Sequence, residues 1–151
     1  MHEFWNNSGS DPTRLGRWRW VRLRGDSGQS TIVVSAYAPS KPAKNSGPTQ
    51  AQNLRTVAKK HQSYFLSCGC KECVRKMFRV HLLEELKSWL DESKNVILCI
   101  NANKNILHGI VARGLRAQGF RDAVRSHCDI DIGRTFKSRG TEQIGAIWVS
   151  A

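Results

Sequence analysis

The sequence has no long hydrophobic run, and its start lacks the features of a secretory signal. No stretch approaches the roughly 18 consecutive apolar residues that cross a membrane, so we expect no membrane partner. The opening, M-H-E-F-W-N-N-S-G-S, has neither a basic start nor an apolar core. With 151 residues the chain is long enough for one hydrophobic core. These features predict an intracellular protein with a single globular domain.

Acidic residues are also scarce. Asp and Glu number 12 against 24 Lys and Arg, which gives a net charge of +12 and a pI near 10.0. Such an excess of positive charge favours a polyanionic partner, nucleic acid before an anionic membrane surface. The alternative is a basic surface that is solvated and has no partner. We expect nucleic acid, DNA in particular, as the partner.

Cysteines are few and odd in number. The chain has five, which without a secretory signal indicates a reducing compartment rather than a disulfide framework. Cys68, Cys70 and Cys73 lie in C-G-C-K-E-C, and His61 is just upstream. A structural zinc site needs four ligands, usually from two paired clusters, and no second cluster is evident. We favour reduced loop cysteines, with a zinc site as the alternative.

Two neighbouring segments predict a pair of strands. R-W-R-W-V-R-L-R at 17–24 alternates apolar and basic residues, but the phase changes after Trp20. A bulge, or partial burial of both faces, explains that change. T-I-V-V-S-A-Y at 31–37 is β-branched and predicts a buried strand that pairs with the first.

The rest of the chain continues the alternation of helices and strands. Apolar residues at three- and four-residue spacing predict an amphipathic helix at 74–91. Residues 1–16 are predicted to be a flexible leader, and 17–150 a single domain. The other predicted elements are a weaker helix within 51–67, a buried strand at 95–100, a helix at 108–118 that ends at Gly119, and a strand at 144–150.

The first strand has two interpretations. Its arginines, Arg17 and Arg19, can contact phosphates while Trp18 and Trp20 stack on bases. Alternatively the tryptophans fill the core and the arginines are solvated. We favour the core for the tryptophans and keep both arginines as candidate phosphate contacts.

A second candidate site lies at strand ends. Tyr37 ends one predicted strand, Asn101 and Asn103 follow another, and Asp122 comes after a helix. Since alternate residues of a strand share a face, we expect Asn101 and Asn103 to point the same way. Asparagines after a strand are, however, also ordinary turn formers.

Several short motifs, in this order, resemble those of the endonuclease/exonuclease/phosphatase superfamily. They are G-R-W-R-W-V-R-L-R, T-I-V-V-S-A-Y-A-P, L-L-E-E-L-K-S-W-L, V-I-L-C-I-N-A-N, G-L-R-A-Q-G-F-R-D-A-V-R, R-T-F and I-G-A-I-W-V-S, within about residues 16–150. The look is closest to endonuclease domains of non-LTR retrotransposons and reverse-transcriptase polyproteins. The resemblance implies an α/β fold, here a partial four-layer sandwich of two packed mixed sheets flanked by helices, with N-terminal and C-terminal strands missing. It also implies Mg²⁺- or Mn²⁺-dependent hydrolysis of phosphate esters.

The resemblance assigns roles to individual residues. Tyr37 matches the tyrosine of an A-Y-x-P motif, Asn103 the phosphate-binding asparagine of D-x-N, and Asp122 with Arg125 a D-x-x-R element. Residues 134–140 match a basic loop close to DNA. The candidate nucleic-acid-binding residues are therefore Arg17, Arg19, Asn103, Arg125, Arg134, Lys137 and Arg139.

The departures from the family pattern concern its carboxylates. Asn101 stands where the family has the aspartate of D-x-N, Lys104 where close relatives have glutamate, and Gly145 where the family has the aspartate of I-D-x-I. A metal-binding glutamate upstream and an Asp-His pair downstream are not in the sequence. We therefore expect no intact metal site, with Mg²⁺ implied by resemblance alone, and vestigial catalytic positions at Tyr37, Asn101, Asn103 and Gly145.

Three hypotheses follow. The leading one is a truncated, catalytically inactive endonuclease domain of retrotransposon type that retains nucleic-acid binding. Its further partners would be the remainder of the endonuclease or a reverse transcriptase, and its location the nucleus. The alternatives are a stand-alone basic nucleic-acid-binding module and a translated remnant without function.

Overall fold

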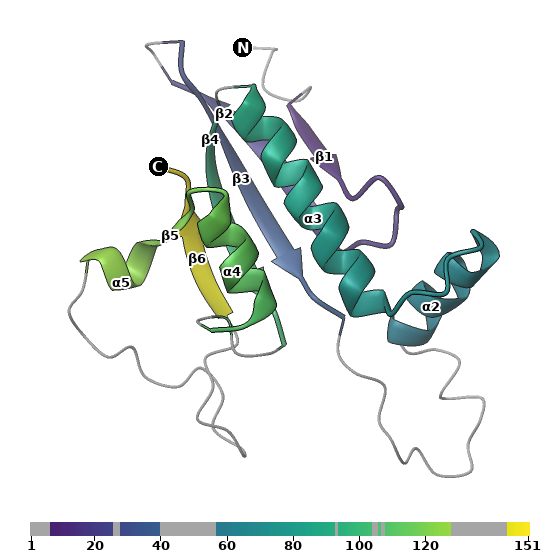
Figure 1. The fold of residues 1–151 in the computed structure, drawn as a ribbon. Coiled ribbons are helices and arrows are strands. Elements are labelled where there is room, and N and C mark those ends of the chain that lie inside the picture. The colour runs from purple at the N-terminus through teal and green to yellow at the C-terminus, as the bar shows by residue number, and fades with distance from the viewer. Residues whose placement is uncertain are drawn as a thin grey trace.

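A computed structural model describes residues 7–25, 28–39, 57–92, 94–103, 106, 108–127 and 145–151. They form one six-stranded mixed sheet with helices, shown in Figure 1, and this confirms the α/β class. The strands are β1 (Ser8–Ser10), β2 (Trp18–Arg24), β3 (Ser30–Tyr37), β4 (Asn95–Asn101), β5 (Arg121–Asp122) and β6 (Gly145–Val149). The helices are α2 (Val57–Ser67), α3 (Val74–Asp91), α4 (Ile110–Ala117) and α5 (Ala123–His127). None of the described helices combines the length and apolarity needed to span a membrane.

The sheet has the strand order β1-β2-β3-β4-β6-β5. At its centre β3 and β4 are parallel and in register from Thr31 opposite Asn95 to Tyr37 opposite Asn101. A parallel pair needs a crossover, and here the chain between the two strands includes α2 and α3. β2 and β6 flank the central pair as antiparallel strands.

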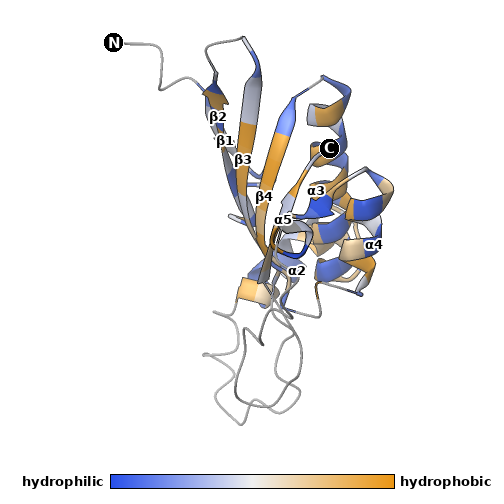
Figure 2. Ribbon diagram, turned by 90° about the vertical axis from the view of Figure 1, so that its left-hand side faces the viewer, coloured by the Kyte–Doolittle hydropathy of each residue, from blue (hydrophilic) through white to orange (hydrophobic). Residues whose placement is uncertain are grey.

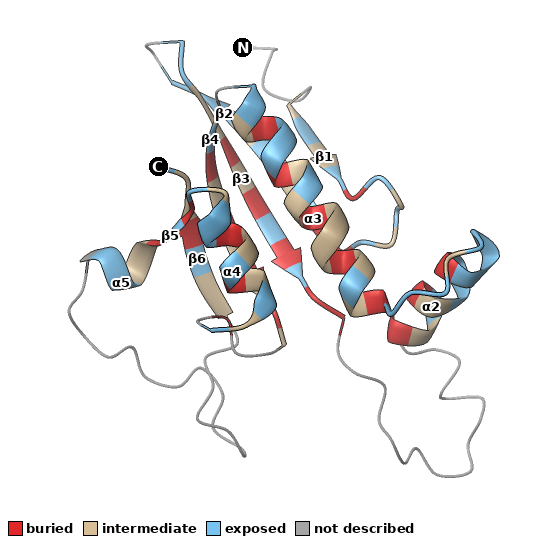
Figure 3. Ribbon diagram, viewed as in Figure 1, coloured by how far each residue is buried: buried red, intermediate tan, exposed pale blue. Residues whose placement is uncertain are grey.

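The helices α3 and α4 cover one face of the sheet, as the side view in Figure 2 shows. Phe78, Leu82 and Leu86 of α3 pack in one cluster with the buried residues of the strands, such as Ile32 and Leu98. Figure 3 shows the buried positions recurring along the side of α3 that faces the sheet. Apolar side chains at this spacing on an 18-residue helix account for its stability.

The described residues form two layers rather than four. The second packed sheet that the resemblance implied is not among them. The face of the sheet opposite α3 therefore exposes apolar side chains: Leu23 is 50% exposed and Ile147 is 41% exposed. Cross-strand register places Val21, Val33, Ile97 and Val149 in one row across four strands on this face, which we call the open face.

The open face also explains the phase change in the first strand. β2 pairs with β3 without interruption from Trp18 to Arg24, so the strand contains no bulge. Trp18 and Trp20 lie on the helix side, where their rings contact Phe78 and Trp89 edge to face. Val21 and Leu23 are apolar residues of the other face. The core role we favoured for the tryptophans is confirmed.

The expected boundary between leader and domain is wrong. Ser8–Ser10 form strand β1 on the edge of β2, and Asp11 is buried, so residues 7–16 belong to the fold. A leader of flexible residues was predicted because this segment is rich in turn-forming residues. The segment is instead fixed by an ion pair between Asp11 and a residue that directly precedes β2.

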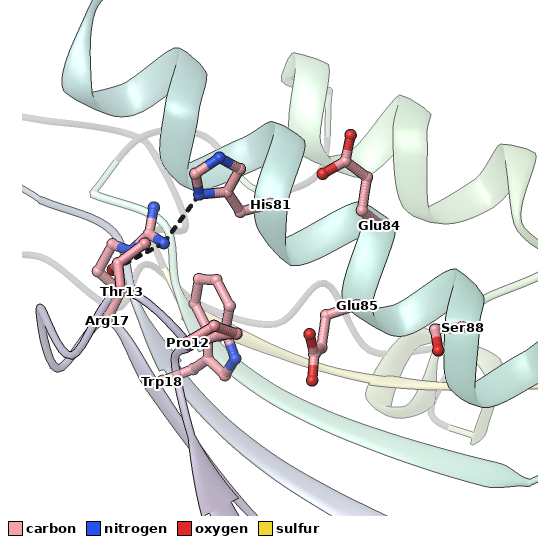
Figure 4. Close-up of a pocket in the computed structure, with 8 residues that line it drawn as sticks. All are labelled: Pro12, Thr13, Arg17, Trp18, His81, Glu84, Glu85 and Ser88. Atoms are coloured by element: carbon pink, nitrogen blue, oxygen red, sulfur yellow. Dashed lines mark hydrogen bonds between the residues drawn. The ribbon is translucent and has the colours of Figure 1, made fainter. Parts of the chain in front are cut away.

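Arg17 is the partner in that ion pair, so its predicted contact with phosphate is wrong. The guanidinium is fully buried and donates to both carboxylate oxygens of Asp11, from Nε at 2.5 Å and from Nη2 at 2.7 Å. Nη2 also lies 3.2 Å from Thr13 Oγ1 and 3.0 Å from Nδ1 of His81, as Figure 4 shows. Burial raises the pKa of Asp11, but hydrogen bonds from Arg17 and Thr13 outweigh burial and hold that pKa below its ordinary value.

Asp11→Asn should therefore destabilise the fold strongly. The substitution leaves the Arg17 charge buried without a counter-charge, which costs about 3 kcal/mol or more of the free energy of unfolding. Urea denaturation of the full chain measures this cost. Asp91→Asn, which removes an exposed carboxylate paired with Lys87, is the control and should change the midpoint little. Equal effects of the two substitutions would contradict the structural role of Asp11.

A buried histidine, His61, and a partly buried one, His81, should make the stability depend on pH. Burial lowers the pKa of His61 despite its hydrogen bond to the Leu15 carbonyl, and burial followed by the charge of Arg17 lowers the pKa of His81. The unfolded chain then takes up protons first, so stability is lost as the pH falls below about 6.5. The melting temperature should fall between about pH 8 and about pH 5.5. His61→Gln/His81→Gln should flatten this dependence; an equally steep dependence in the double variant would refute the assignment.

Candidate functional site

Three of the predicted site residues lie in one row at an edge of the sheet. Tyr37 ends β3 and pairs with Asn101, which ends the parallel strand β4. Asn101 in turn pairs with Gly145, the first residue of the antiparallel strand β6. The carboxyl ends of parallel strands lie at the same edge of a sheet, so the β3–β4 pairing brings these positions together.

The row borders a shallow depression on the open face. Its volume is about 490 Å³, and its wall includes Val124 of α5 as well as the row itself. Tyr37 is 50% exposed, so its hydroxyl group is accessible to a ligand. The lining residues are Ser35, Ala36, Tyr37, Cys99, Ile100, Asn101, Val124, Gly145, Ala146 and Ile147.

Asn103 lies differently from the sequence expectation. The strand ends at Asn101, and Asn103 has a left-handed backbone with φ of 49°, so strand alternation does not extend to it. Its backbone N–H donates to Oδ1 of Asn101 at 3.0 Å, and its side-chain amide donates to the Ala38 carbonyl at 2.6 Å. Asn103 is not among the residues that line the depression. Its side chain joins the ends of β3 and β4.

Sequence reasoning missed Arg75 in this region. Its Nε donates to the Pro39 carbonyl at 2.9 Å, and its Nη2 donates to the Asn103 carbonyl at 3.2 Å. The guanidinium is therefore fixed on the two loops that leave β3 and β4. Nothing in the sequence indicated this, because Arg75 is distant from both loops along the chain and belongs to no recognised motif.

Asp122 and Arg125 form the start of a short helix. Oδ1 of Asp122 accepts hydrogen bonds from the backbone N–H groups of Val124 and Arg125, both at 3.1 Å, which caps α5. Asp122 is 8% exposed and lies away from solvent, whereas Arg125 is exposed. The D-x-x-R element thus positions Val124 beside the depression and leaves the arginine accessible.

Of the remaining residues singled out in the sequence, one is exposed in the structure and the others lie outside the described residues. Arg19 is exposed and follows the alternation of β2 onto the open face. Lys104, Arg134, Lys137 and Arg139 lie outside the described residues.

The cysteine cluster has no metal-binding geometry in the part of the chain that is described. Cys68, Cys70 and Cys73 have free thiols, and Sγ of Cys70 contacts Sδ of Met77 at 3.6 Å. Nε2 of the nearby His61 bonds to a backbone carbonyl. Within the described ranges, no three His, Cys, Asp or Glu side chains are grouped so that they could hold a metal ion.

The row at the sheet edge does not fit Mg²⁺. This ion requires carboxylate oxygens and bound water in octahedral geometry. The row offers a phenol at Tyr37, an amide at Asn101 and no side chain at Gly145. Oδ1 of Asn101, its better ligand atom, already accepts the N–H of Asn103. The site can donate hydrogen bonds to a phosphate but supplies no negative charge to a cation.

Comparisons with known proteins agree on the fold. No protein-family model matches the chain, and no curated protein matches it in sequence. The catalytic domain of human Nocturnin matches 88% of this chain with a TM-score of 0.52 and 12% identity, and a humanized D. rerio TDP2 matches 95% with a TM-score of 0.50 and 11% identity. An endonuclease/exonuclease/phosphatase family protein from Bacteroides thetaiotaomicron matches 88% with a TM-score of 0.49 and 14% identity.

The matched structures are longer than this chain. It covers 40% of the Nocturnin domain and of the Bacteroides protein, and 50% of the TDP2 structure. At this identity the similarity concerns the fold alone. The chain therefore shares part of a mixed α/β fold with the Nocturnin catalytic domain and TDP2.

Introducing two carboxylates should create a cation site in the row. A side chain at Gly145 would meet only the Ile100 carbonyl, at 3.7 Å, and aspartate at 101 can still accept the N–H of Asn103. Directly opposed residues have Cβ atoms roughly 5 Å apart, so the two carboxylates can share one ion. Millimolar Mn²⁺ should raise the melting temperature of Asn101→Asp/Gly145→Asp, with much smaller shifts for either single variant and for the natural sequence. A Mn²⁺ shift in the natural chain equal to that of the double variant would contradict this account of the row.

Proposed function

We propose that this chain is part of an endonuclease/exonuclease/phosphatase-like phosphodiesterase domain of retrotransposon type that binds DNA without hydrolysing it. The observation that carries the proposal is the neutral row of Tyr37, Asn101 and Gly145 at the sheet edge of a fold shared with such proteins. Tyr37 matches the tyrosine of the family motif, whereas Asn101 and Gly145 stand where the family has aspartates.

The chemistry of the row argues against hydrolysis. An amide cannot accept a proton from water near neutral pH, so Asn101 cannot act as a general base. General acid–base catalysis contributes roughly 10²- to 10⁴-fold to such reactions, and a metal ion adds several kcal/mol of charge stabilisation. With neither group supplied by the described residues, we expect no measurable phosphodiester cleavage.

The same changes favour binding. Replacing carboxylates by an amide and a glycine removes repulsion between the site and phosphate oxygens. The hydroxyl of Tyr37 and the exposed guanidinium groups of Arg19 and Arg125 can donate to phosphates, and the net charge of +12 attracts a polyanion from a distance.

The open face supports a second partner, the remainder of the same kind of domain. Val21, Val33, Ile97 and Val149 form a continuous apolar row on the face of the sheet opposite α3 and α4. A sheet packed on this row would bury it and bring a second set of side chains to the depression. We propose that this complementary half belongs to a further segment of an endonuclease-type domain.

Nucleic-acid binding without cleavage is tested on the purified chain. Its affinity for a fluorescein-labelled DNA duplex should fall roughly 40-fold between 50 mM and 200 mM salt if about three phosphates are contacted. Supercoiled plasmid with Mg²⁺ or Mn²⁺ should remain intact. Tyr37→Phe and Arg19→Gln should each weaken binding, whereas the control Lys87→Gln, on the far end of α3, should not.

Two outcomes would reject the proposal. Nicking that Tyr37→Phe abolishes would show that the row is catalytic as it stands. A failure to bind DNA at low salt would remove the binding function. Binding that changes neither with Tyr37→Phe nor with Arg19→Gln would favour a basic module whose contacts lie elsewhere.

A further inference from the structure

A pocket lined by three arginines lies on the helix side of the same sheet edge. Its volume is about 220 Å³. Arg75 and Arg79 come from the first turns of α3, and Arg113 comes from α4. No acidic residue lines the pocket. None of these arginines belongs to the motifs or to the row described above.

The pocket is adjacent to the row. Ala38 and Ala102, which line it, directly follow Tyr37 and Asn101 in the chain. In Figure 1 the end of β3 and the starts of α3 and α4 lie together at the lower end of the molecule. The pocket and the row therefore lie at the same end of the strands, the pocket on the helix side and the row on the open face.

The arginines differ in how firmly they are held. Arg75 is fixed by its hydrogen bonds to the carbonyls of Pro39 and Asn103, and its Nη1 remains for a further acceptor. The side chains of Arg79 and Arg113 make no hydrogen bond or ion pair with the described part of the protein. Like charges crowded around one cavity repel each other, and a bound anion would remove that repulsion.

The other walls of the pocket are apolar. Phe78 and Ala102 are buried at its base, while Ile110 is 54% exposed beside it and Val111 completes the wall. A free inorganic anion would use the guanidinium groups but not this surface. The combination fits a ligand with a phosphate on one end and a flat, weakly polar body on the other.

We propose that this pocket binds one nucleotide of a nucleic-acid strand, with the phosphate on Arg75, Arg79 and Arg113 and the base or sugar on Ile110 and Val111. The inference rests on the proposed nucleic-acid binding and assigns it a specific site. It adds a phosphate contact on the helix side of the edge, where the sequence motifs indicate no candidate.

The test compares two double variants of equal charge. Arg79→Gln/Arg113→Gln should weaken binding of a labelled single-stranded oligodeoxynucleotide by about tenfold or more and reduce the salt slope by about one. Lys60→Gln/Lys71→Gln removes two exposed positive charges outside the pocket and should weaken binding by less than about threefold. Circular dichroism melts establish that both variants fold. Equal losses of affinity in the two variants would overturn the proposal and leave only general charge attraction.

A second arm identifies the ligand class by ¹⁵N NMR titration of the full chain. Thymidine monophosphate should shift the amides of Ile110, Val111 and Arg113 at lower concentration than inorganic phosphate does, and Ile110→Ser should remove that advantage. Equal affinities for the two probes would refute a nucleotide site and indicate a simple anion site. If the chain binds no oligonucleotide, the proposed function is rejected. The thymidine monophosphate titration then still decides whether the pocket binds a nucleotide.

Discussion

The parallel pairing of β3 with β4 is the constraint on which the rest of the structure depends. Seven residue pairs join the two strands in register, with β2 and β1 added on one side of this pair and β6 and β5 on the other. The crossover between them carries α3, whose apolar side closes the core on one face of the sheet. The same pairing ends at Tyr37 and Asn101, so the position of the candidate site follows from the register that stabilises the core.

The backbone geometry of the row does not depend on charged side chains at Asn101 or Gly145. The row keeps three aligned positions, and Asn103 joins the two strand ends through its side-chain amide. The amide of Asn101 makes the same turn hydrogen bond that a carboxylate would make, so loss of the charge need not disturb the fold. The nearby arginines are the basis of the phosphate binding that we propose for this edge.

Much of the fold was predictable because strong local patterns coincide with the tertiary structure. The helix at 74–91 has a single period that matches the face it buries, and the β-branched run at 31–37 favours a buried strand. Arg17 was misassigned because a buried arginine and a solvated one look alike in an alternating strand until the partner, Asp11, is known. The sequence also could not reveal Arg75 and Arg113, which come together only through the crossover. Asn103 failed the alternation argument because the strand ends two residues earlier.

The central claim is that Tyr37, Asn101 and Gly145 form one row at the edge of a sheet with a single covered face. Nuclear Overhauser effects between backbone protons of the full chain measure this register directly. We predict contacts of the parallel type between Tyr37 and Asn101 and of the antiparallel type between Asn101 and Gly145. A register shifted by one residue would turn Asn101 toward the helices, because each shift exchanges the two faces of a strand, and would contradict the account.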